Sequence, residues 1–325
     1  MRNKISVLMP VYNCESYIYD SIASILDQSF KNIELIIIDD CSTDLSFEII
    51  SQFSDERIIL LRNEKNLGVA SSLNACIKRA SGDYLARMDA DDIAEKHRLN
   101  TQLNYLLVNK LDMVGSYITT FGEIRSTVLK NPVSNEDVKF FMNFLNPIAH
   151  PSILGKKEAF QNLYNPKYFR VEDYEFWARL ISLNFKIGNV PLSLLNYRIS
   201  SSQISNNNFI ELKKQSLEVV SIYSSFYFSK EYFLEFKKTN FGYSKNNIKF
   251  LLNYVSNNKK SISLGPLFID LNFLLFKRSF DILDFLKFNF LLSQNGLFKE
   301  IIHFYKNLFF SFKFNFLTKI KNYFF

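Results

Sequence analysis

Apolar strands that alternate with helices constrain the fold of this chain more than any other feature of its sequence. The clearest strand is "ELIIIDD", residues 34–40, because an unbroken run of isoleucines fits a strand that is covered on both faces. An earlier apolar run, "ISVLM" at residues 5–9, is stopped by Pro10. Between the two, "ESYIYDSIASILDQSF" carries isoleucines near helical spacing. The chain therefore opens with a strand, a helix and a second strand.

The same alternation continues to residue 89. "STDLSFEIISQF" and "VASSLNACIKRA" predict two further helices, and "RIILLR" and "GDYLARMD" predict a third and a fourth strand. Helices that alternate with strands at this spacing predict a mainly parallel α/β sheet. In such a sheet, ligands bind beyond the carboxyl ends of the strands.

Polar or charged residues end three of these strands: "PVYN" at 10–13, "DD" at 39–40 and "DADD" at 89–92. The carboxylates of the last group repel one another unless they face water or bind a cation. Mg²⁺ and Mn²⁺ take oxygen ligands and bridge to phosphate oxygens, so "DADD" predicts a metal-diphosphate site. The alternative is a solvated acidic turn in which Asp92 caps the next helix. Because the sequence has no G-x-G-x-x-G and no Walker motif, metal would have to neutralise the diphosphate.

Several blocks of the sequence, in order, resemble those of family-2 glycosyltransferases with the GT-A fold. They are "SVLMPVYNCESYIYDSIASILDQSF", "ELIIIDDCSTD", "NLGVASSLNACIKRASGDYLARMDADD" and "VEDYEFWARL", and the resemblance covers roughly residues 3–198. It implies a mainly parallel central sheet flanked by helices, followed by a mainly helical C-terminal region. The Q-x-x-R-W signature of processive members is absent, which favours the transfer of a single sugar.

The resemblance implies a donor side built from the first strand ends. Pro10 and Tyr12 would hold the nucleotide with Asp40, which would accept an N–H of the base, while Asp39 would orient the loop. Asn66 and Gly68 would lie where a chain segment approaches the donor. Two structural alternatives remain open from the residues alone: Tyr12 as a half-buried loop aromatic, and Gly68 as a simple helix-entry residue.

The resemblance also implies the metal ligands and the base. Asp89 and Asp91 would hold Mn²⁺ or Mg²⁺, with Asp89 also facing the donor, and Asp173 would accept the proton of the acceptor hydroxyl. Glu172 and Asp173 could instead merely stabilise a helix N-terminus. The predicted acceptor side consists of His150, Glu172 and Trp177, although a histidine between prolines is equally typical of a structural residue.

The C-terminal part differs in composition from the rest. Residues 201–325 contain 17 Lys+Arg and 8 Asp+Glu, a net charge of +9, and 23 of the 34 phenylalanines. The polar stretch "SSSQISNNN" at 200–208 marks a boundary, so we predict a catalytic domain over 1–200 and a helical, basic region over 201–325. That region would bind an anionic membrane surface, or alternatively pack on the catalytic domain or a partner subunit. Nucleic acid fits it poorly, because the basic residues accompany an apolar face.

These patterns together predict an inverting, metal-dependent transferase that moves one sugar from a nucleoside-diphosphate sugar, UDP-linked, to a hydroxyl of a lipid-linked surface glycan. The first ten residues lack a signal-peptide core, and the longest stretch without Asp, Glu, Lys or Arg is 16 residues, too short for a membrane span. We therefore expect a cytoplasmic protein, peripheral on the inner face of the cell membrane. The rival hypotheses are an aspartyl-nucleophile phosphohydrolase, which the missing D-x-D-x-[TV] motif disfavours, and a non-catalytic protein that binds sugar nucleotides or membranes.

Overall fold

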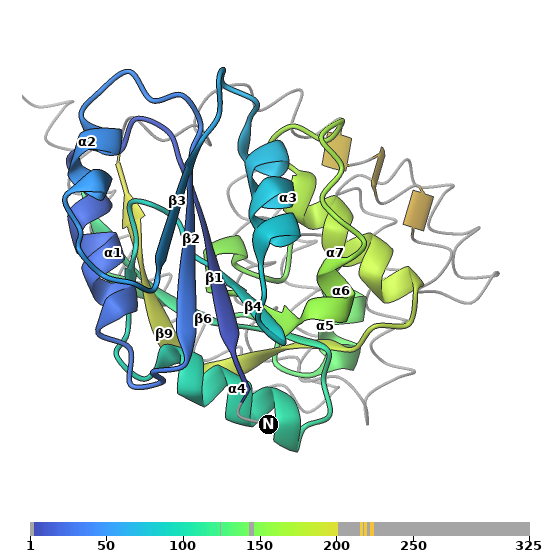
Figure 1. Cartoon of the computed structure of the whole chain (residues 1–325). Helices are drawn as coiled ribbons and strands as arrows, with labels where there is room; N and C mark the ends of the chain where they lie inside the picture. Colours follow the sequence, from blue (N-terminus) through green and yellow to red (C-terminus); the bar gives the residue numbers. More distant parts are fainter. Residues whose placement is uncertain are drawn as a thin grey trace, which may run out of the picture. The chain divides into compact units, whose positions relative to one another are not determined.

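The computed structural model describes residues 3–123, 125–142 and 146–200, together with residues 215, 216, 218, 219, 222 and 223. Its first half alternates strands with helices as predicted (Figure 1). The elements are β1 (Ile5–Val11), α1 (Ile18–Leu26), β2 (Ile33–Asp39), α2 (Ser46–Ser51), β3 (Ile58–Arg62), α3 (Val69–Arg79) and β4 (Tyr84–Arg87). The predicted C-terminal helical region lies almost wholly outside the described residues.

The first four strands form the parallel half of one sheet, in the order β3-β2-β1-β4. Every residue of β2 is buried, which agrees with its unbroken isoleucine run. Figure 1 shows α1 and α2 on one side of this sheet and α3 on the other. Since parallel strands end at the same edge, the polar residues after β1, β2 and β4 share that edge, as the sequence predicts.

One detail of β1 differs from the prediction. The strand does not stop at Pro10 but continues to Val11, and Pro10 pairs in register with Ile38 of β2. On its other side, β1 pairs with β4 only as far as Leu8 opposite Arg87. Pro10 therefore lies where the strand has β2 as its one sheet neighbour, and a residue without an N–H is tolerated there.

The second half of the described chain turns the parallel sheet into a mixed one. Its elements are β5 (Ile93–Ala94), α4 (Arg98–Val108), β6 (Met113–Gly122), β7 (Thr127–Leu129), α5 (Asn135–Phe141), η1 (His150–Ser152), β8 (Leu154–Lys156), α6 (Lys157–Phe160), α7 (Glu172–Ser182) and β9 (Ile187–Ile199). The sheet continues from β4 as β8-β6-β9-β5, with β8 antiparallel to both of its neighbours. The predicted helix at "VEDYEFW" is α7.

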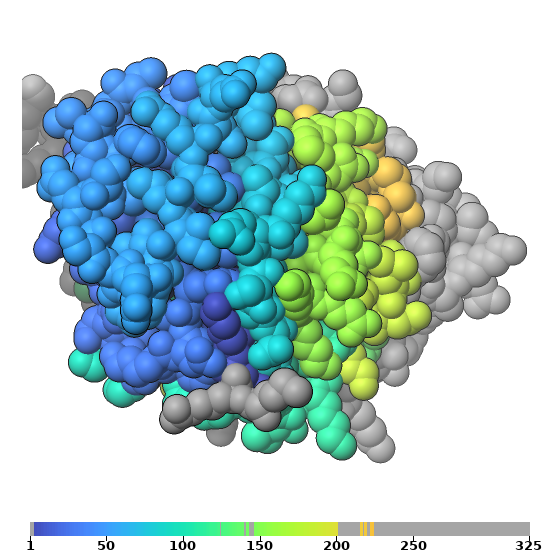
Figure 2. Space-filling view, viewed as in Figure 1, coloured from blue at the N-terminus to red at the C-terminus, as the bar shows by residue number. Residues whose placement is uncertain are grey.

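The two halves meet across α3. The Asn74 side chain of α3 bonds both the N–H and the carbonyl of Tyr164, at 2.7 and 2.8 Å, in the loop that leads to α7. In the space-filling view the surfaces of α3 and of the α6–α7 segment adjoin directly (Figure 2). The helix that carries Asp173 is thereby attached to the parallel half.

A few described residues beyond 200 pack on the same body. Glu218 accepts from Lys167 Nζ at 3.0 Å and from the Tyr168 hydroxyl at 3.2 Å, and the Tyr223 hydroxyl donates to Glu175 at 3.0 Å. Val219 is buried. Among the helices that the structure describes, none has the length and apolar character needed to cross a bilayer.

Candidate active site

The loops that follow β1 and β2 are joined by hydrogen bonds at the carboxyl edge of the sheet. Three backbone N–H groups of the first loop donate to side chains of the second: Asn13 to Ser42 Oγ (3.0 Å), Cys14 to Ser46 Oγ (2.7 Å) and Glu15 to Asp44 Oδ2 (3.0 Å). In the opposite direction, the backbone N–H groups of Thr43 and Leu45 donate to Asn13 Oδ1 (2.9 Å) and Glu15 Oε2 (2.9 Å). Tyr12, 43% exposed, stands beside this junction. Pro10, near the end of β1, is half-buried.

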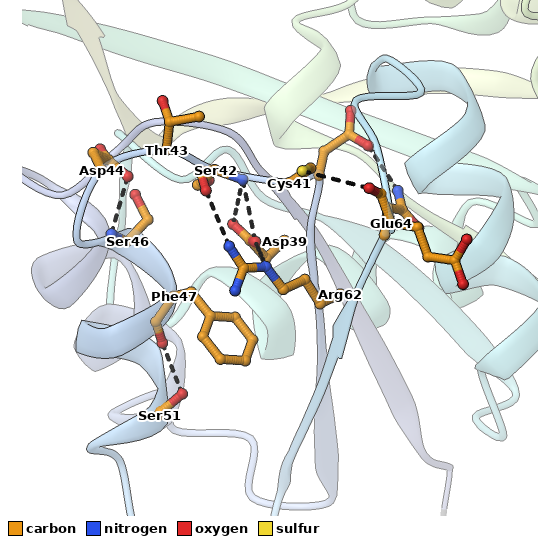
Figure 3. A network of polar contacts seen from close by, with 12 residues as sticks. Asp39, Cys41, Ser42, Thr43, Asp44, Ser46, Phe47, Ser51, Arg62 and Glu64 are labelled. Carbon is orange, nitrogen blue, oxygen red and sulfur yellow. Dashed lines mark hydrogen bonds and ion pairs between the residues drawn. The ribbon is translucent and has the colours of Figure 1, made fainter.

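Asp39 orients the second loop (Figure 3). Its buried carboxylate accepts from the N–H of Ser42 and pairs with Arg62 at 3.0 Å, and Arg62 also donates to the Ser42 carbonyl. The guanidinium of Arg62 lies over the ring of Phe47 at 4.5 Å. These contacts agree with the predicted loop-orienting role of Asp39.

Asp40 faces the segment that precedes α3. Its carboxylate accepts from Asn63 Nδ2 (2.7 Å), Leu67 N (2.9 Å) and Gly68 N (2.8 Å). Since a carboxylate offers about four acceptor sites, one remains for a base N–H. Gly68 has φ +83°, and among the described residues no atom lies within 4 Å of a Cβ built on it. Asn66 is exposed next to it, so the segment leaves room for a ligand.

The three aspartates after β4 form a compact group. One oxygen from each of Asp89, Asp91 and Asp92 lies within 4.8 Å of the others. Asp92 is fully buried, accepts from the Arg198 N–H at 2.8 Å, and keeps an Oδ2 without a hydrogen-bond partner among the described residues. Burial, and next the charges of Asp89 and Asp91, raise the pKa of Asp92 well above its usual value.

The alternative of a solvated, helix-capping turn is therefore wrong. Asp92 is buried, and the residue that precedes helix α4 is His97. Arg98, the first residue of α4, supports the turn: it is fully buried and donates to the Arg87 carbonyl at 2.7 Å. Arg198 braces it from β9 by donating to the Asp91 carbonyl at 2.8 Å.

Glu172 and Asp173 begin α7 and meet different surroundings. Asp173 is half-buried and accepts from Asn146 Nδ2 at 2.6 Å and from the Tyr174 N–H at 2.7 Å. Glu172 is buried, and its Oε2 has no hydrogen-bond partner among the described residues. Desolvation raises the pKa of both groups, and with the charge of Asp173 it brings the pKa of Glu172 to about 7.

His150 and Trp177 lie in an aromatic cluster near this pair. The Nε2 atom of His150 is 3.0 Å from the Tyr164 hydroxyl, and the ring packs edge-on against Trp177 with centroids 5.7 Å apart. Burial and the nearby Arg87 lower the pKa of His150 well below its usual value, so the imidazole is neutral at pH 7. Trp177 is fully buried. Their predicted places on the acceptor side stay predictions.

The sequence interpretation missed Arg87, the last residue of β4. It is 5% exposed, pairs with Asp89 Oδ1 at 2.5 Å, and lies close enough to Glu172, Asp173 and His150 to affect the charge of all three. An arginine in the otherwise apolar stretch "YLAR" was the available signal, because a buried guanidinium requires acidic partners. Arg87 therefore lies near both the aspartates after β4 and the carboxylates that begin α7.

Comparisons with known proteins point to one family. A family model described as "Glycosyl transferase family 2" matches residues 6–165. An uncharacterized glycosyltransferase of Haemophilus influenzae is 34% identical over 218 residues, which cover 62% of this chain and 67% of the relative. The putative glycosyltransferase EpsE of Bacillus subtilis is 34% identical over 216 residues, 63% of this chain and 77% of the relative. The chain belongs to glycosyl transferase family 2.

A third relative of this family-2 glycosyltransferase has a named activity. It is the UDP-Glc:alpha-D-GlcNAc-diphosphoundecaprenol beta-1,3-glucosyltransferase WfaP of Escherichia coli, which is 32% identical over 220 residues, covering 67% of this chain and 86% of the relative. Family membership confirms the predicted glycosyltransferase and rules out the phosphohydrolase alternative.

Solved structures confirm the GT-A fold of this family-2 glycosyltransferase. S. aureus TarS in complex with UDP-GlcNAc superimposes with a TM-score of 0.59 at 16% identity, covering 80% of this chain and 82% of that chain. The mannosyltransferase PcManGT from Pyrobaculum calidifontis, in complex with GDP-Man and Mn²⁺, gives 0.51 at 15% identity, covering 71% and 64%.

The aspartate group fits a hard divalent cation. It offers carboxylate oxygens alone, which are the ligands that Mg²⁺ and Mn²⁺ prefer. The buried Oδ2 of Asp92 is an acceptor without a donor among the described residues, and a cation nearby would compensate its charge.

Proposed function

We propose that this family-2 glycosyltransferase transfers one sugar, with inversion, from a UDP-sugar to an acceptor hydroxyl. The observation that carries the proposal is the proximity of two acidic groups to the same buried arginine. Arg87 pairs with Asp89 of the aspartates after β4, and its charge also acts on Glu172 and Asp173 at the start of α7. The first group suits a metal-bound diphosphate and the second suits a proton acceptor.

Asp173 is the proposed base. Its bonds from Asn146 and from the Tyr174 N–H fix the orientation of the carboxylate, and both stabilise its ionised form. The acceptor hydroxyl would give its proton to Asp173 while its oxygen attacks the anomeric carbon from the face opposite the leaving diphosphate. Glu172, Trp177 and His150 would shape the acceptor side behind this carboxylate.

Tyr12 and Asp40 are proposed to hold the nucleotide beside Pro10, with the base packed on the exposed ring of Tyr12. Gly68 and Asn66 would border the donor, because the space beside Gly68 is open among the described residues. Asp89 and Asp91 would hold Mg²⁺ or Mn²⁺. When bound, such a cation stabilises negative charge on the leaving diphosphate.

The acceptor is proposed to be a lipid-linked surface glycan. WfaP supports this by its name, as does the putative teichuronic acid biosynthesis glycosyltransferase TuaG of Bacillus subtilis, 30% identical over 213 residues. The proposed catalytic domain is 1–200, and the basic region 201–325 is proposed to bring the enzyme to the cytoplasmic face of the membrane.

A nucleotide screen tests the donor site. We expect UDP with Mn²⁺ to raise the melting temperature of the full chain, and EDTA to abolish the effect, because a ligand that binds only the folded state stabilises it. GDP and dTDP, each with Mn²⁺, are the comparison ligands. Stabilisation by GDP or dTDP in place of UDP would correct the donor class, and stabilisation by none of the three would refute the proposal.

Two substitutions separate the donor site from the base. Asp91→Ala should weaken Mn²⁺-dependent UDP binding by at least about tenfold, whereas Asp173→Asn should keep that binding and lose transfer by about 10²–10⁴-fold. Near-normal transfer by a folded Asp173→Asn protein would remove Asp173 from its proposed role.

A further inference from the structure

Arg87 is a buried cation among acidic groups. Its side chain is 6% exposed, and among the described residues only the Nη2 atom of the guanidinium has a partner, Asp89 Oδ1 at 2.5 Å. The Nε and Nη1 atoms are buried without a hydrogen-bond partner among the described residues. A guanidinium that satisfies so few of its donors is costly to bury, so its charge must be compensated by nearby carboxylates.

Those carboxylates come from two distant parts of the chain. Asp89 follows Arg87 on the donor side, and Glu172 and Asp173 belong to α7 on the base side. The backbone of Arg87 is fixed at both ends, since its N–H donates to the Ile153 carbonyl at 3.0 Å and its carbonyl accepts from Arg98 at 2.7 Å. With the backbone of Arg87 thus fixed, its guanidinium is held by the ion pair with Asp89.

We propose that Arg87 is a positioning residue that couples the two sides of the site: its ion pair fixes the Asp89 carboxylate, and its buried charge stabilises the negative charge of Asp173 and Glu172. The inference rests on the proposed function of these three carboxylates. It assigns to Arg87 no contact with substrate.

The ion pair leaves Asp89 available to a ligand. A carboxylate has two oxygens, so Asp89 can accept from Arg87 through Oδ1 while Oδ2 serves a cation or the donor. Without Arg87, Asp89 would rotate freely at the end of β4. Asp89 and Asp91 repel one another, which adds a reason for the free carboxylate to turn away.

The effect on the base follows from charge and burial. The titratable or charged groups around Asp173 are Glu172 on α7, Arg87 on β4 and Tyr164 in the preceding loop, with Asp89 and His150 on the other side of Arg87. Arg87 is the cation in this set, and it lowers the pKa of both Glu172 and Asp173 against the larger effect of desolvation. Removing it should therefore leave the base protonated up to a higher pH.

The test compares Arg87→Met, which removes the charge, with Arg87→Lys, which keeps it but loses the planar fork. One readout is calorimetric affinity for UDP with Mn²⁺, replaced by GDP or dTDP if the nucleotide screen selects one of them. The other is the acid limb of the pH profile for release of UDP from UDP-glucose, with water as acceptor. Arg179→Met is the matched control, because Arg179 pairs with Glu175 on the same helix as Asp173.

We expect Arg87→Met to weaken binding about tenfold and to move the acid limb up by about one pH unit, the size of effect that loss of a neighbouring charge produces. Arg87→Lys should keep the acid limb of the pH profile at its wild-type position, because the charge is kept. Its affinity for UDP should be several-fold weaker than that of the wild type, because the planar fork is lost. Arg179→Met should lower the melting temperature and change neither readout.

A folded Arg87→Met protein with wild-type affinity and an unmoved limb would overturn the inference, even if it melts at a lower temperature. If Arg87→Met does not fold, Arg87→Lys decides: weaker binding with an unmoved limb supports the inference, and wild-type binding overturns it. Failure of the proposed function would give different results. The wild type would then neither bind UDP nor release it from UDP-glucose, or the Asp173→Asn variant would turn over normally.

Discussion

Glu172 and Asp173 are neighbours in the sequence, but the fold gives them opposite surroundings. Asp173 is half-buried with two hydrogen-bond donors on its carboxylate, whereas Glu172 is buried with an unpaired Oε2 among the described residues. A carboxylate that is bonded in its ionised form suits a base. Desolvation raises the pKa of both groups, and it brings the pKa of Glu172 to about 7. The two donors that orient the Asp173 carboxylate support Asp173 for the proposed role.

Glu172 makes stability depend on pH. The folded protein keeps its Glu172 proton up to about pH 7, while the unfolded chain releases it near the usual value of 4.5. Between these values the folded state binds more protons, so stability falls as pH rises, by on the order of 3 kcal/mol for this group alone. Glu172→Gln should flatten that fall, as measured by urea midpoints at about pH 5 and about pH 8.

The exposed Glu158 of α6 provides the control for this prediction. Glu158→Gln should leave the pH dependence of stability as in the wild type. A slope that is equally steep in Glu172→Gln would mean that another group is responsible for it.

Gly68 carries a second residue-scale prediction. Its φ of 83° and ψ of 162° fall in a region that is essentially restricted to glycine, while the space beside it is open among the described residues. Gly68→Ala should therefore cost about 1–3 kcal/mol through backbone strain without a steric clash. Ser71→Ala, one turn into the same helix, is the comparison in a thermal melt. Equal stability of the two variants would show that this φ is not required.

At the level of structural elements, the carboxyl edge of the sheet is organised by hydrogen bonds between the loop after β1 and the loop after β2. Arg62, at the end of β3, pairs with Asp39 and holds the loop after β2 (Figure 3). Tyr12 and Asp40 belong to these loops, so three successive strands position the proposed nucleotide site.

Arg62→Met tests this arrangement. It leaves the fully buried carboxylate of Asp39 with the Ser42 N–H as its remaining donor among the described residues, which should cost about 1–3 kcal/mol. Arg57→Met removes a similar ion pair, to Asp55, in a turn where both side chains are about a quarter exposed, and should cost about 0–1 kcal/mol. Urea unfolding compares the two. Equal losses would contradict a specific role for the Arg62–Asp39 pair.

At the scale of the whole molecule, charge separates the two predicted regions. Residues 1–200 carry 22 basic and 24 acidic residues, whereas residues 201–325 carry 17 and 8. The described residues of the second region, among them Glu218 and Tyr223, pack on the first. The net charge of +9 in residues 201–325 is the basis for the proposal that this region binds an anionic surface.

We therefore expect the full chain to sediment with vesicles that contain phosphatidylserine. Raising NaCl to about 0.5 M should lower the bound fraction severalfold, because salt screens the attraction between basic residues and anionic lipid. Vesicles of phosphatidylcholine alone are the control. Equal binding to both would show that apolar contacts dominate, and no binding to either would favour the alternative that this region packs on protein.

Sequence patterns were sufficient to predict the strands and helices of the first 90 residues and the helix that begins with Glu172. They also predicted the edge of the sheet to which Tyr12, Asp40 and Asp91 belong. These features depend on local patterns: apolar periodicity, breaks after strands and the order of short motifs. Family resemblance could be read from the same blocks because they are contiguous in the chain.

The remaining features depend on tertiary contacts. Pro10 lies inside β1 at a point that β4 does not reach, and Asp92 is buried and bonded to the backbone of β9. Arg87 pairs with Asp89 and lies near the charges of Glu172 and Asp173, which are far from it in the sequence. The mixed order of β8, β6 and β9 likewise follows from long-range pairing. Burial and ion pairs depend on distances between remote segments, and a local pattern contains no information about those distances.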